Sequence, residues 1–223
     1  MEFNSMKLKK PNLGLASPVW ALVFAALMSQ VGGNVALAGQ PGNVAAPRIA
    51  ETLCINCHGA QGRNDSLLYP QLAGQPASYL EAQLVAFKDR TRADPQAQVY
   101  MWGFAGGLSD SAIKELAAYY AAQTPAAGTP QTADPREIAA GKKIFIEGIP
   151  SENVPACFAC HGEEAQGKAT FPRLAGQHRD YLVDQLQHFK DGRRSNAIMH
   201  NIVRNMTDEE FVSVSAYLES LGK

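Results

Sequence analysis

The chain carries one ordered set of motifs twice, and this duplication constrains its fold more than any other feature. The run Cys54-Ile-Asn-Cys57-His58-Gly59 returns in the second half as Cys157-Phe-Ala-Cys160-His161-Gly162. After each run come a Pro-x-Leu-Ala-Gly-Gln segment, a helical pattern and a methionine. The remaining matched pairs are Pro70 and Pro172, Gln75 and Gln177, Tyr79 and Tyr181, Arg92 and Arg194, and Met101 and Met199. Such internal repetition indicates two homologous domains.

Composition places the boundary between the two copies. Between them lies a small, uncharged stretch that contains Pro125, Gly128 and Pro130. Because proline interrupts helices and favours extended chain, this stretch is typical of a linker. We therefore predict a first domain at 42–124, a linker at 125–133 and a second domain at 134–223.

The secondary-structure pattern of each copy is helical, with no segment that alternates as a strand does. Apolar residues recur at helical spacing after several start signals. The predicted signals are capping boxes at Ser78 with Glu81 and at Thr207 with Glu210, a cap at Ser109, and a helix from Glu137 to Glu147 that stops at Gly148. Aromatic residues make up only 8% of the chain. Each small all-α domain would therefore have a small hydrophobic core and need additional stabilisation, such as a bound group.

The Cys-x-x-Cys-His motif identifies the group that would supply this additional stabilisation. Cysteines three apart lie on one face of a helical turn, where both can form thioethers with the vinyl groups of a porphyrin. The next side chain, His58 or His161, then points its imidazole at the iron. We therefore predict two covalently bound haem c groups, held by Cys54, Cys57, Cys157 and Cys160.

Other uses of the four cysteines fit the pattern less well. A four-cysteine zinc site needs its two pairs in one small knuckle, and here each pair belongs to a different repeat. A thioredoxin-type pair needs a βαβ context and no histidine. A disulfide within each pair would leave both histidines unexplained.

A methionine is the predicted ligand on the other side of each iron. Met101 and Met199 occupy matching positions in the two repeats, and methionine–histidine ligation raises the reduction potential. Met206 matches Leu108 and is expected to pack in a core. His200, beside Met199, is the alternative ligand in the second repeat, whereas His178 and His188 are expected to be surface groups.

The repeat also predicts residues that surround the haem. An iron-bound imidazole needs an acceptor for its other N–H, and the backbone carbonyls of Pro70 and Pro172 are natural acceptors. Six matched side chains could bond to haem propionates: Gln75, Gln177, Tyr79, Tyr181, Arg92 and Arg194. For the two tyrosines, simple helix packing is the alternative.

The N-terminal segment resembles an export signal. Basic Lys7, Lys9 and Lys10 precede an apolar stretch that ends in Ala36-Leu-Ala38, a small-x-small cleavage site. We predict a signal peptide over residues 1–38, of which residues 1–5 resemble a cloning remnant. An uncleaved membrane anchor is the alternative. The chain as a whole is near neutral, with net charge −1, which argues against binding nucleic acid.

Taken in order, these motifs resemble the dihaem cytochrome c4 family over nearly the whole chain after residue 38. The resemblance implies two tandem class I cytochrome c domains with facing propionates. It also implies a periplasmic, often membrane-associated electron carrier rather than an enzyme. Its donor would be a membrane quinol-oxidising complex or a dehydrogenase, and its acceptor a terminal oxidase.

The chain departs from this family pattern at four places, which leave its partner open. The first repeat has Arg90 where the second has Gly192, a longer loop at 93–100 and Trp102 beside Met101. The second repeat has an insertion at 148–155. One alternative is the cytochrome subunit of a dehydrogenase of the flavocytochrome c sulfide dehydrogenase type. Another is a dihaem enzyme, a peroxidase or a thiosulfate-oxidising protein, which requires an open iron site.

Overall fold

A computed structural model describes residues 45–126 and 133–222. Both repeats lie in one compact unit, Pro41–Lys223. The predicted signal peptide, with the cloning remnant, lies outside the described residues, as does most of the predicted linker. Within the described ranges the chain is helical, and its only β-structure is two isolated bridges, Ile149 with Val154 and Lys168 with Phe171.

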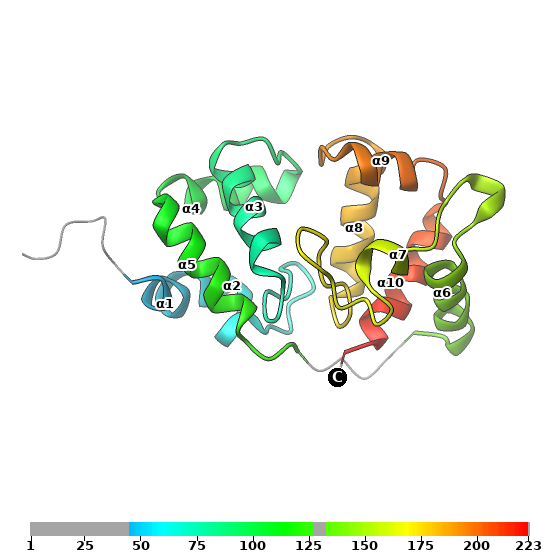
Figure 1. Ribbon diagram of the computed structural model, residues 1–223, viewed down its shortest axis with the longest axis horizontal. Coiled ribbons are helices and arrows are strands. Elements are labelled where there is room, and N and C mark those ends of the chain that lie inside the picture. Colours follow the sequence, from blue (N-terminus) through cyan, green and yellow to red (C-terminus); the bar gives the residue numbers. More distant parts are fainter. Residues whose placement is uncertain (1–44, 127–132, 223) are drawn as a thin grey trace, which may run out of the picture. The chain divides into compact units, whose positions relative to one another are not determined.

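The first repeat opens with a helical run that carries the first Cys-x-x-Cys-His motif (Figure 1). The run consists of α1 (Ala46–Ile49), η2 (Ala50–Cys54) and α2 (Ile55–His58). A one-turn helix, two longer helices and the segment bearing Met101 follow. These are η3 (Ala60–Gly62), α3 (Ala77–Lys88), η4 (Ala97–Met101), α4 (Trp102–Gly106) and α5 (Asp110–Ala121).

The second repeat has the same order of helices, except that η5 lies in its insertion and no described helix matches η3. It consists of α6 (Pro135–Glu147), η5 (Pro150–Glu152), α7 (Phe158–His161), α8 (Arg179–Lys190), α9 (Ala197–Val203) and α10 (Asp208–Ser220). A matching backbone hydrogen bond joins the same two segments in each repeat. Gly74 N–H donates to the Tyr120 carbonyl and Gly176 N–H to the Leu218 carbonyl, both at 2.9 Å. The predicted all-α, two-domain architecture is confirmed.

Most helix boundaries follow their capping residues. The capping box of Thr207 and Glu210 is present, Ser109 accepts the Ala112 N–H, and α6 ends at Gly148. The predicted box at Ser78 is wrong, because α3 begins after Pro76 and no side chain caps it. The Pro76 carbonyl already accepts the Leu80 N–H, so Ser78 lies inside the first turn.

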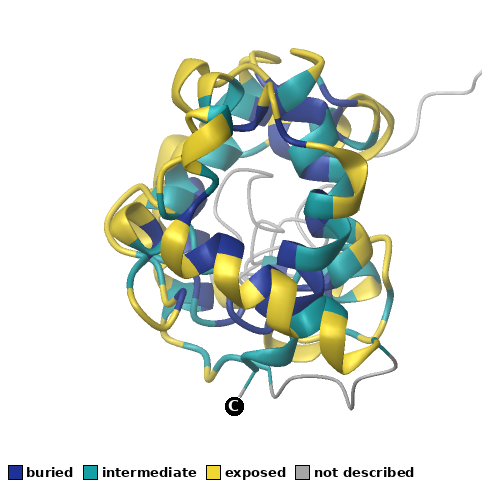
Figure 2. Cartoon of the chain, turned by 90° about the vertical axis from the view of Figure 1, so that its right-hand side faces the viewer, coloured by how far each residue is buried: buried dark blue, intermediate teal, exposed yellow. Residues whose placement is uncertain are grey.

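Each repeat buries its own apolar core, and the exposed sides of its helices face outward (Figure 2). In the second repeat, α6 and α10 cross so closely that a Cβ added to Gly141 would lie 1.9 Å from the Ser213 carbonyl oxygen. Phe145 and Phe211, both 0% exposed, lie in the core on these two helices. In the first repeat the core is split between a cluster around Leu116 and a smaller one around Phe87.

The described helices are all too short or too polar to cross a lipid bilayer.

Candidate functional site

The Cys-x-x-Cys-His motif forms one helical turn in each repeat. In the first, α2 follows Cys54 and ends at His58; in the second, α7 follows Cys157 and ends at His161. The next residue, Gly59, has φ +73°, and a Cβ there would lie 1.9 Å from the Arg63 carbonyl oxygen. Glycine therefore lets the chain turn away directly after the histidine.

The two cysteines of each motif differ in environment. Cys54 and Cys157 pack against the cores of their domains, whereas Cys160 is exposed. Burial raises the pKa of the Cys54 thiol and raises that of Cys157 to about 11. Among the described residues no disulfide joins any of the four cysteines, so all four sulfur atoms are available for thioethers.

Both histidines are held by a proline carbonyl. The Nδ1 atoms of His58 and His161 lie 3.0 Å from the carbonyl oxygens of Pro70 and Pro172, respectively. Each histidine is 8% exposed, and burial lowers its imidazole pKa. The ring is therefore neutral at pH 7, with Nδ1–H donating and Nε2 free to bind a metal.

The two methionine segments lie on the core of their own domain. Met101 ends η4 and packs on the Phe87 cluster, and Met199 packs on the second core. Aromatic contacts tie the Met101 segment to His58, since Tyr69 lies 6.2 Å from the His58 ring and 5.8 Å from the Tyr100 ring. The third methionine of the two repeats, Met206, is 2% exposed and belongs to the core, as expected.

Two of the three remaining histidines are placed differently from expectation. His178 and His188 are 3% and 5% exposed, so the prediction that they are surface groups is wrong. Each contacts the other repeat: His178 Nε2 lies 3.0 Å from Gln71 Nε2, and His188 Nε2 lies 3.3 Å from Gln96 Oε1. His200 Nδ1 lies 2.9 Å from the Phe189 carbonyl oxygen.

Matched polar side chains meet between the repeats and form what we call the interdomain cluster: Tyr79, Gln83, Arg92, Tyr181, Gln185 and Arg194. Arg92 donates to Gln185 Oε1 at 2.9 Å, and Arg194 donates to Gln83 Oε1 at 2.8 Å. Each arginine also donates to a tyrosine of the other repeat, Arg194 to Tyr79 at 3.0 Å and Arg92 to Tyr181 at 3.4 Å. The tyrosines thus have a specific partner beyond helix packing.

The cluster carries an uneven charge. Arg92 and Arg194 are 8% and 7% exposed, and the carboxylate of Asp94 forms an ion pair with Arg92 at 2.8 Å. Burial acts to raise the pKa of Tyr79, but the nearby Arg194 and Arg92 outweigh it and lower that pKa. Two buried guanidinium groups with one carboxylate leave a positive site that suits an anionic group such as a haem propionate.

Gln75 and Gln177 are also at this boundary, but their amides bond to backbone. Both are buried, and each bonds through its oxygen and its nitrogen to one residue of the opposite repeat. Gln83, Gln185 and Asp94 were not predicted as site residues. The matched positions of the two glutamines in the repeat are the signal that could have found them.

The donor set of each repeat fits a c-type haem. It supplies two thiols on one turn, an imidazole with Nε2 available, a thioether in the same domain and a cationic cluster. Arg173 Nε, next to Pro172, is a buried donor without a hydrogen-bond partner, and the Glu164 carboxylate acts on the same guanidinium group. Within 45–126 and 133–222, no three His, Cys, Asp or Glu side chains are arranged to hold a bare metal ion.

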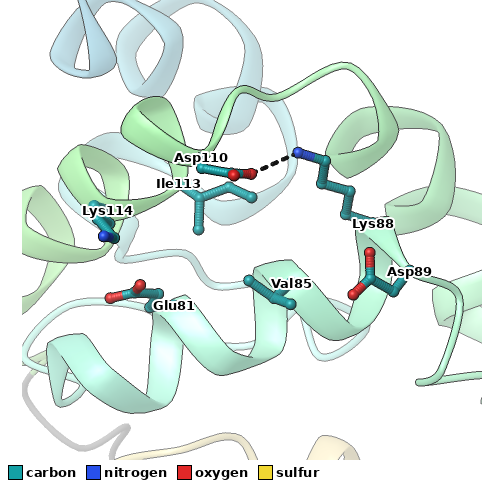
Figure 3. Close-up of a pocket in the computed structure, with 7 residues that line it drawn as sticks. All are labelled: Glu81, Val85, Lys88, Asp89, Asp110, Ile113 and Lys114. Atoms are coloured by element: carbon teal, nitrogen blue, oxygen red, sulfur yellow. Dashed lines mark hydrogen bonds and ion pairs between the residues drawn. The ribbon is translucent and has the colours of Figure 1, made fainter.

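A surface pocket lies between α3 and α5 of the first repeat, away from these residues (Figure 3). It is lined by Glu81, Val85, Lys88, Asp89, Asp110, Ile113 and Lys114, and an ion pair of Lys88 with Asp110 closes one end. Its α3 residues lie on the face opposite Tyr79 and Gln83, by helical spacing. The pocket contains none of the predicted haem residues.

Known proteins resemble this chain over both repeats. The family model of cytochrome c matches residues 44–122 and 138–222. Cytochrome c4 of Thiocapsa roseopersicina is 38% identical over 198 residues, 86% of this chain and 99% of that protein. The cytochrome c4 structure from Acidithiobacillus ferrooxidans is 42% identical with a TM-score of 0.72, covering 75% of this chain and 98% of that one. A thiosulfate dehydrogenase electron acceptor of Thiomonas intermedia is 36% identical over 170 residues, 74% of this chain and 76% of that protein.

Proposed function

Because the chain belongs to the cytochrome c family and, within it, to the dihaem cytochrome c4 group, we propose that it is a periplasmic carrier of single electrons. It holds two covalently bound haem c groups and is an electron-transfer protein. Its donor is a membrane quinol-oxidising complex or a dehydrogenase, and its acceptor is a terminal oxidase.

Each repeat supplies a complete set of haem-binding residues. Cys54 and Cys57 bind the first haem and Cys157 and Cys160 the second, through thioethers. Haem held there would supply one-electron chemistry between ferrous and ferric iron. His58 and Met101 would hold the first iron, and His161 and Met199 the second, so that protein side chains would leave no place at either iron for a reactant.

The observation that carries this proposal is the pair of equal hydrogen bonds from histidine to proline. In both repeats Nδ1 lies 3.0 Å from the carbonyl oxygen, at the end of the Cys-x-x-Cys-His turn. This bond sets the ring tautomer, leaves Nε2 for the iron and raises its basicity. A fixed imidazole changes little in position when the iron changes charge, which favours fast electron transfer.

Spectroscopy of the purified protein tests the proposal. Mass spectrometry should find two haem groups that survive denaturation, and a redox titration should resolve two one-electron steps. The ferric spectrum should be low-spin, with the weak far-red charge-transfer band of methionine bound to iron. A chain without covalent haem, or a high-spin resting spectrum, would instead favour a different protein class or a dihaem enzyme.

The similarity to a thiosulfate dehydrogenase electron acceptor favours a second candidate for the donor. In this version the chain accepts electrons from a dehydrogenase that oxidises a sulfur compound. Stopped-flow reduction by a thiosulfate dehydrogenase, compared with reduction by a quinol-oxidising complex, separates the two donors. Stable co-purification with a flavoprotein would instead point to a dehydrogenase subunit.

We also propose that the protein is located at the periplasmic side of the inner membrane and is attached there peripherally. The export-type segment over residues 1–38 supports this location. Fractionation of cells that express the full chain, with and without a high-salt wash, would distinguish a peripheral protein from an anchored one.

A further inference from the structure

Two buried glutamines connect the repeats by a pattern different from that of the interdomain cluster. Gln75 donates from Nε2 to the Arg173 carbonyl at 2.7 Å and accepts the Arg173 N–H at 3.0 Å. Gln177 does the same with Gln71, donating to its carbonyl at 3.0 Å and accepting its N–H at 2.8 Å. The glutamines are 5% and 4% exposed. Each amide therefore bonds to both backbone polar groups, N–H and C=O, of one residue in the other repeat, a contact that we call a grip.

The gripped residues follow the histidine-binding prolines directly. Arg173 comes after Pro172, whose carbonyl accepts from His161, and Gln71 comes after Pro70, whose carbonyl accepts from His58. The Pro172 carbonyl and the Arg173 N–H belong to one rigid peptide plane. A bond that holds the N–H therefore also orients the carbonyl on which the imidazole depends.

We propose that Gln75 and Gln177 are positioning residues for the proximal histidine of the opposite domain. Gln75, in the first repeat, sets the His161 bond of the second haem, and Gln177 sets the His58 bond of the first. The inference rests on the proposed function, because it assumes that these histidines bind the two irons. Neither glutamine acts on the haem of its own domain by this route.

The two grips differ in how much other support they have. Asn64 also donates to the Pro70 carbonyl, at 3.3 Å, and its backbone bonds to the Gln71 side chain. Among the described residues, no side chain other than His161 bonds to the Pro172 carbonyl. The second haem therefore depends more on Gln75 than the first haem does on Gln177.

The effect on the iron has a definite sign. A well-placed carbonyl makes the histidine a stronger donor, because it draws on the Nδ1–H proton. A stronger donor stabilises ferric iron and lowers the reduction potential. Loss of the glutamine contact weakens the histidine–proline hydrogen bond and should raise the reduction potential of the haem in the opposite domain.

Variants that keep volume but remove the bonds test the proposal in the full, haem-loaded chain. Gln75→Met should shift the potential of the second haem upward and leave that of the first in place. Gln177→Met should shift only the first, and by less. The haems are told apart by the axial-methionine methyl signals in the proton NMR spectrum of the reduced protein, which disappear singly in Met101→His and Met199→His.

A direct readout on the protein chain accompanies the potentials. The Arg173 amide proton should exchange with solvent faster in Gln75→Met, and the Gln71 amide proton faster in Gln177→Met. Gln96→Met is the matched control, since Gln96 contacts His188 across the same boundary but bonds to neither proline segment. It should loosen the contact without moving either potential.

The outcomes are distinct. The proposal is overturned if the reduction potential shifts only for the haem of the substituted domain. It is also overturned if amide exchange becomes faster but neither potential shifts. In both cases the protein keeps its two redox steps. Equal shifts in Gln96→Met would show that general loosening of the boundary is responsible, which also overturns it. A wild-type protein without two redox steps would instead refute the proposed function.

Discussion

Asp94 and Arg92 form a buried ion pair, with 2.8 Å between Oδ2 and Nε and side chains that are 1% and 9% exposed. Asp94 also accepts the Ala97 N–H at the start of η4, the segment that ends at Met101. Asn196 has the matching place in the second repeat, where it caps α9 without a charge. One repeat thus has an ionic support where the other has a neutral one.

Removing this carboxylate should destabilise the first repeat. Asp94→Ala leaves the Arg92 guanidinium buried without its charge partner, and we expect a loss of about 3 kcal/mol. Asn196→Ala is the control, because it removes a cap alone and should cost about 1 kcal/mol. Urea denaturation followed by circular dichroism measures both; equal losses would contradict the role given to the ion pair.

The same pair predicts how stability changes with pH. Burial acts to raise the pKa of Asp94, but Arg92 outweighs it, so the native pKa lies below the unfolded one. The stability that the ion pair contributes is therefore fully present above the pKa of Asp94 in the unfolded chain, about 3.9. It is lost as the pH falls through the pKa of Asp94 in the folded protein. Between pH 5 and 2, as rough limits, the unfolding free energy of the wild type should fall more steeply than that of Asp94→Asn. Parallel curves would rule this out.

The crossing of α6 and α10 should tolerate no side chain at Gly141. An added Cβ would lie 1.9 Å from the Ser213 carbonyl oxygen and 2.9 Å from Tyr217 Cβ. The helices must separate, and we expect Gly141→Ala to cost about 3 kcal/mol. Gly103→Ala, in α4 with nothing within 4 Å of the new Cβ, should instead stabilise the protein by about 0.5 kcal/mol. Thermal unfolding of both variants makes the comparison.

A departure between the repeats gives a backbone prediction. Gly192 has φ +77° with open space around it, so Gly192→Ala should cost about 1 kcal/mol from backbone strain alone. Arg90, at the matching place, has φ +58° and lies over the Trp102 ring at 5.4 Å. Arg90→Gly relieves strain but loses this contact, so its stability should change by less than about 0.5 kcal/mol. A neutral Gly192→Ala in chemical denaturation would refute the strain.

Axial ligation by methionine predicts a chemical difference between two methionines of one domain. Met199→Ala should open the second haem to carbon monoxide in the ferrous state, without haem loss, and remove its share of the far-red band. Met206→Leu changes a core methionine and should leave carbon monoxide binding absent, at a cost below about 1.5 kcal/mol. If Met199→Ala stays closed to carbon monoxide, His200 or another group is the ligand.

The sequence predicts the parts that depend on local pattern and repetition. The helical class and the cap at Thr207 follow from residue type and spacing alone. The proline acceptors followed from the need of an iron-bound imidazole. The prediction of a capping box at Ser78 was wrong because the Pro76 carbonyl, and not a side chain, accepts a hydrogen bond at the start of α3.

What the sequence does not contain is which surfaces of the two repeats meet. His178 and His188 have polar side chains that suggest exposure, yet the second repeat buries them against the first. Gln83 and Gln185 look like ordinary helix residues until the opposite arginine is placed beside them. Periodicity describes one helix at a time, so partners from distant parts of the chain stay undetermined.

The exchanged grips of Gln75 and Gln177 have a consequence for how such a duplicated gene can change. After a duplication, each copy is ordinarily free to drift as long as its own half keeps working. Here a substitution of either glutamine changes the haem of the other half, so natural selection on one half also acts on the sequence of the other. The two halves therefore cannot evolve independently at these two positions.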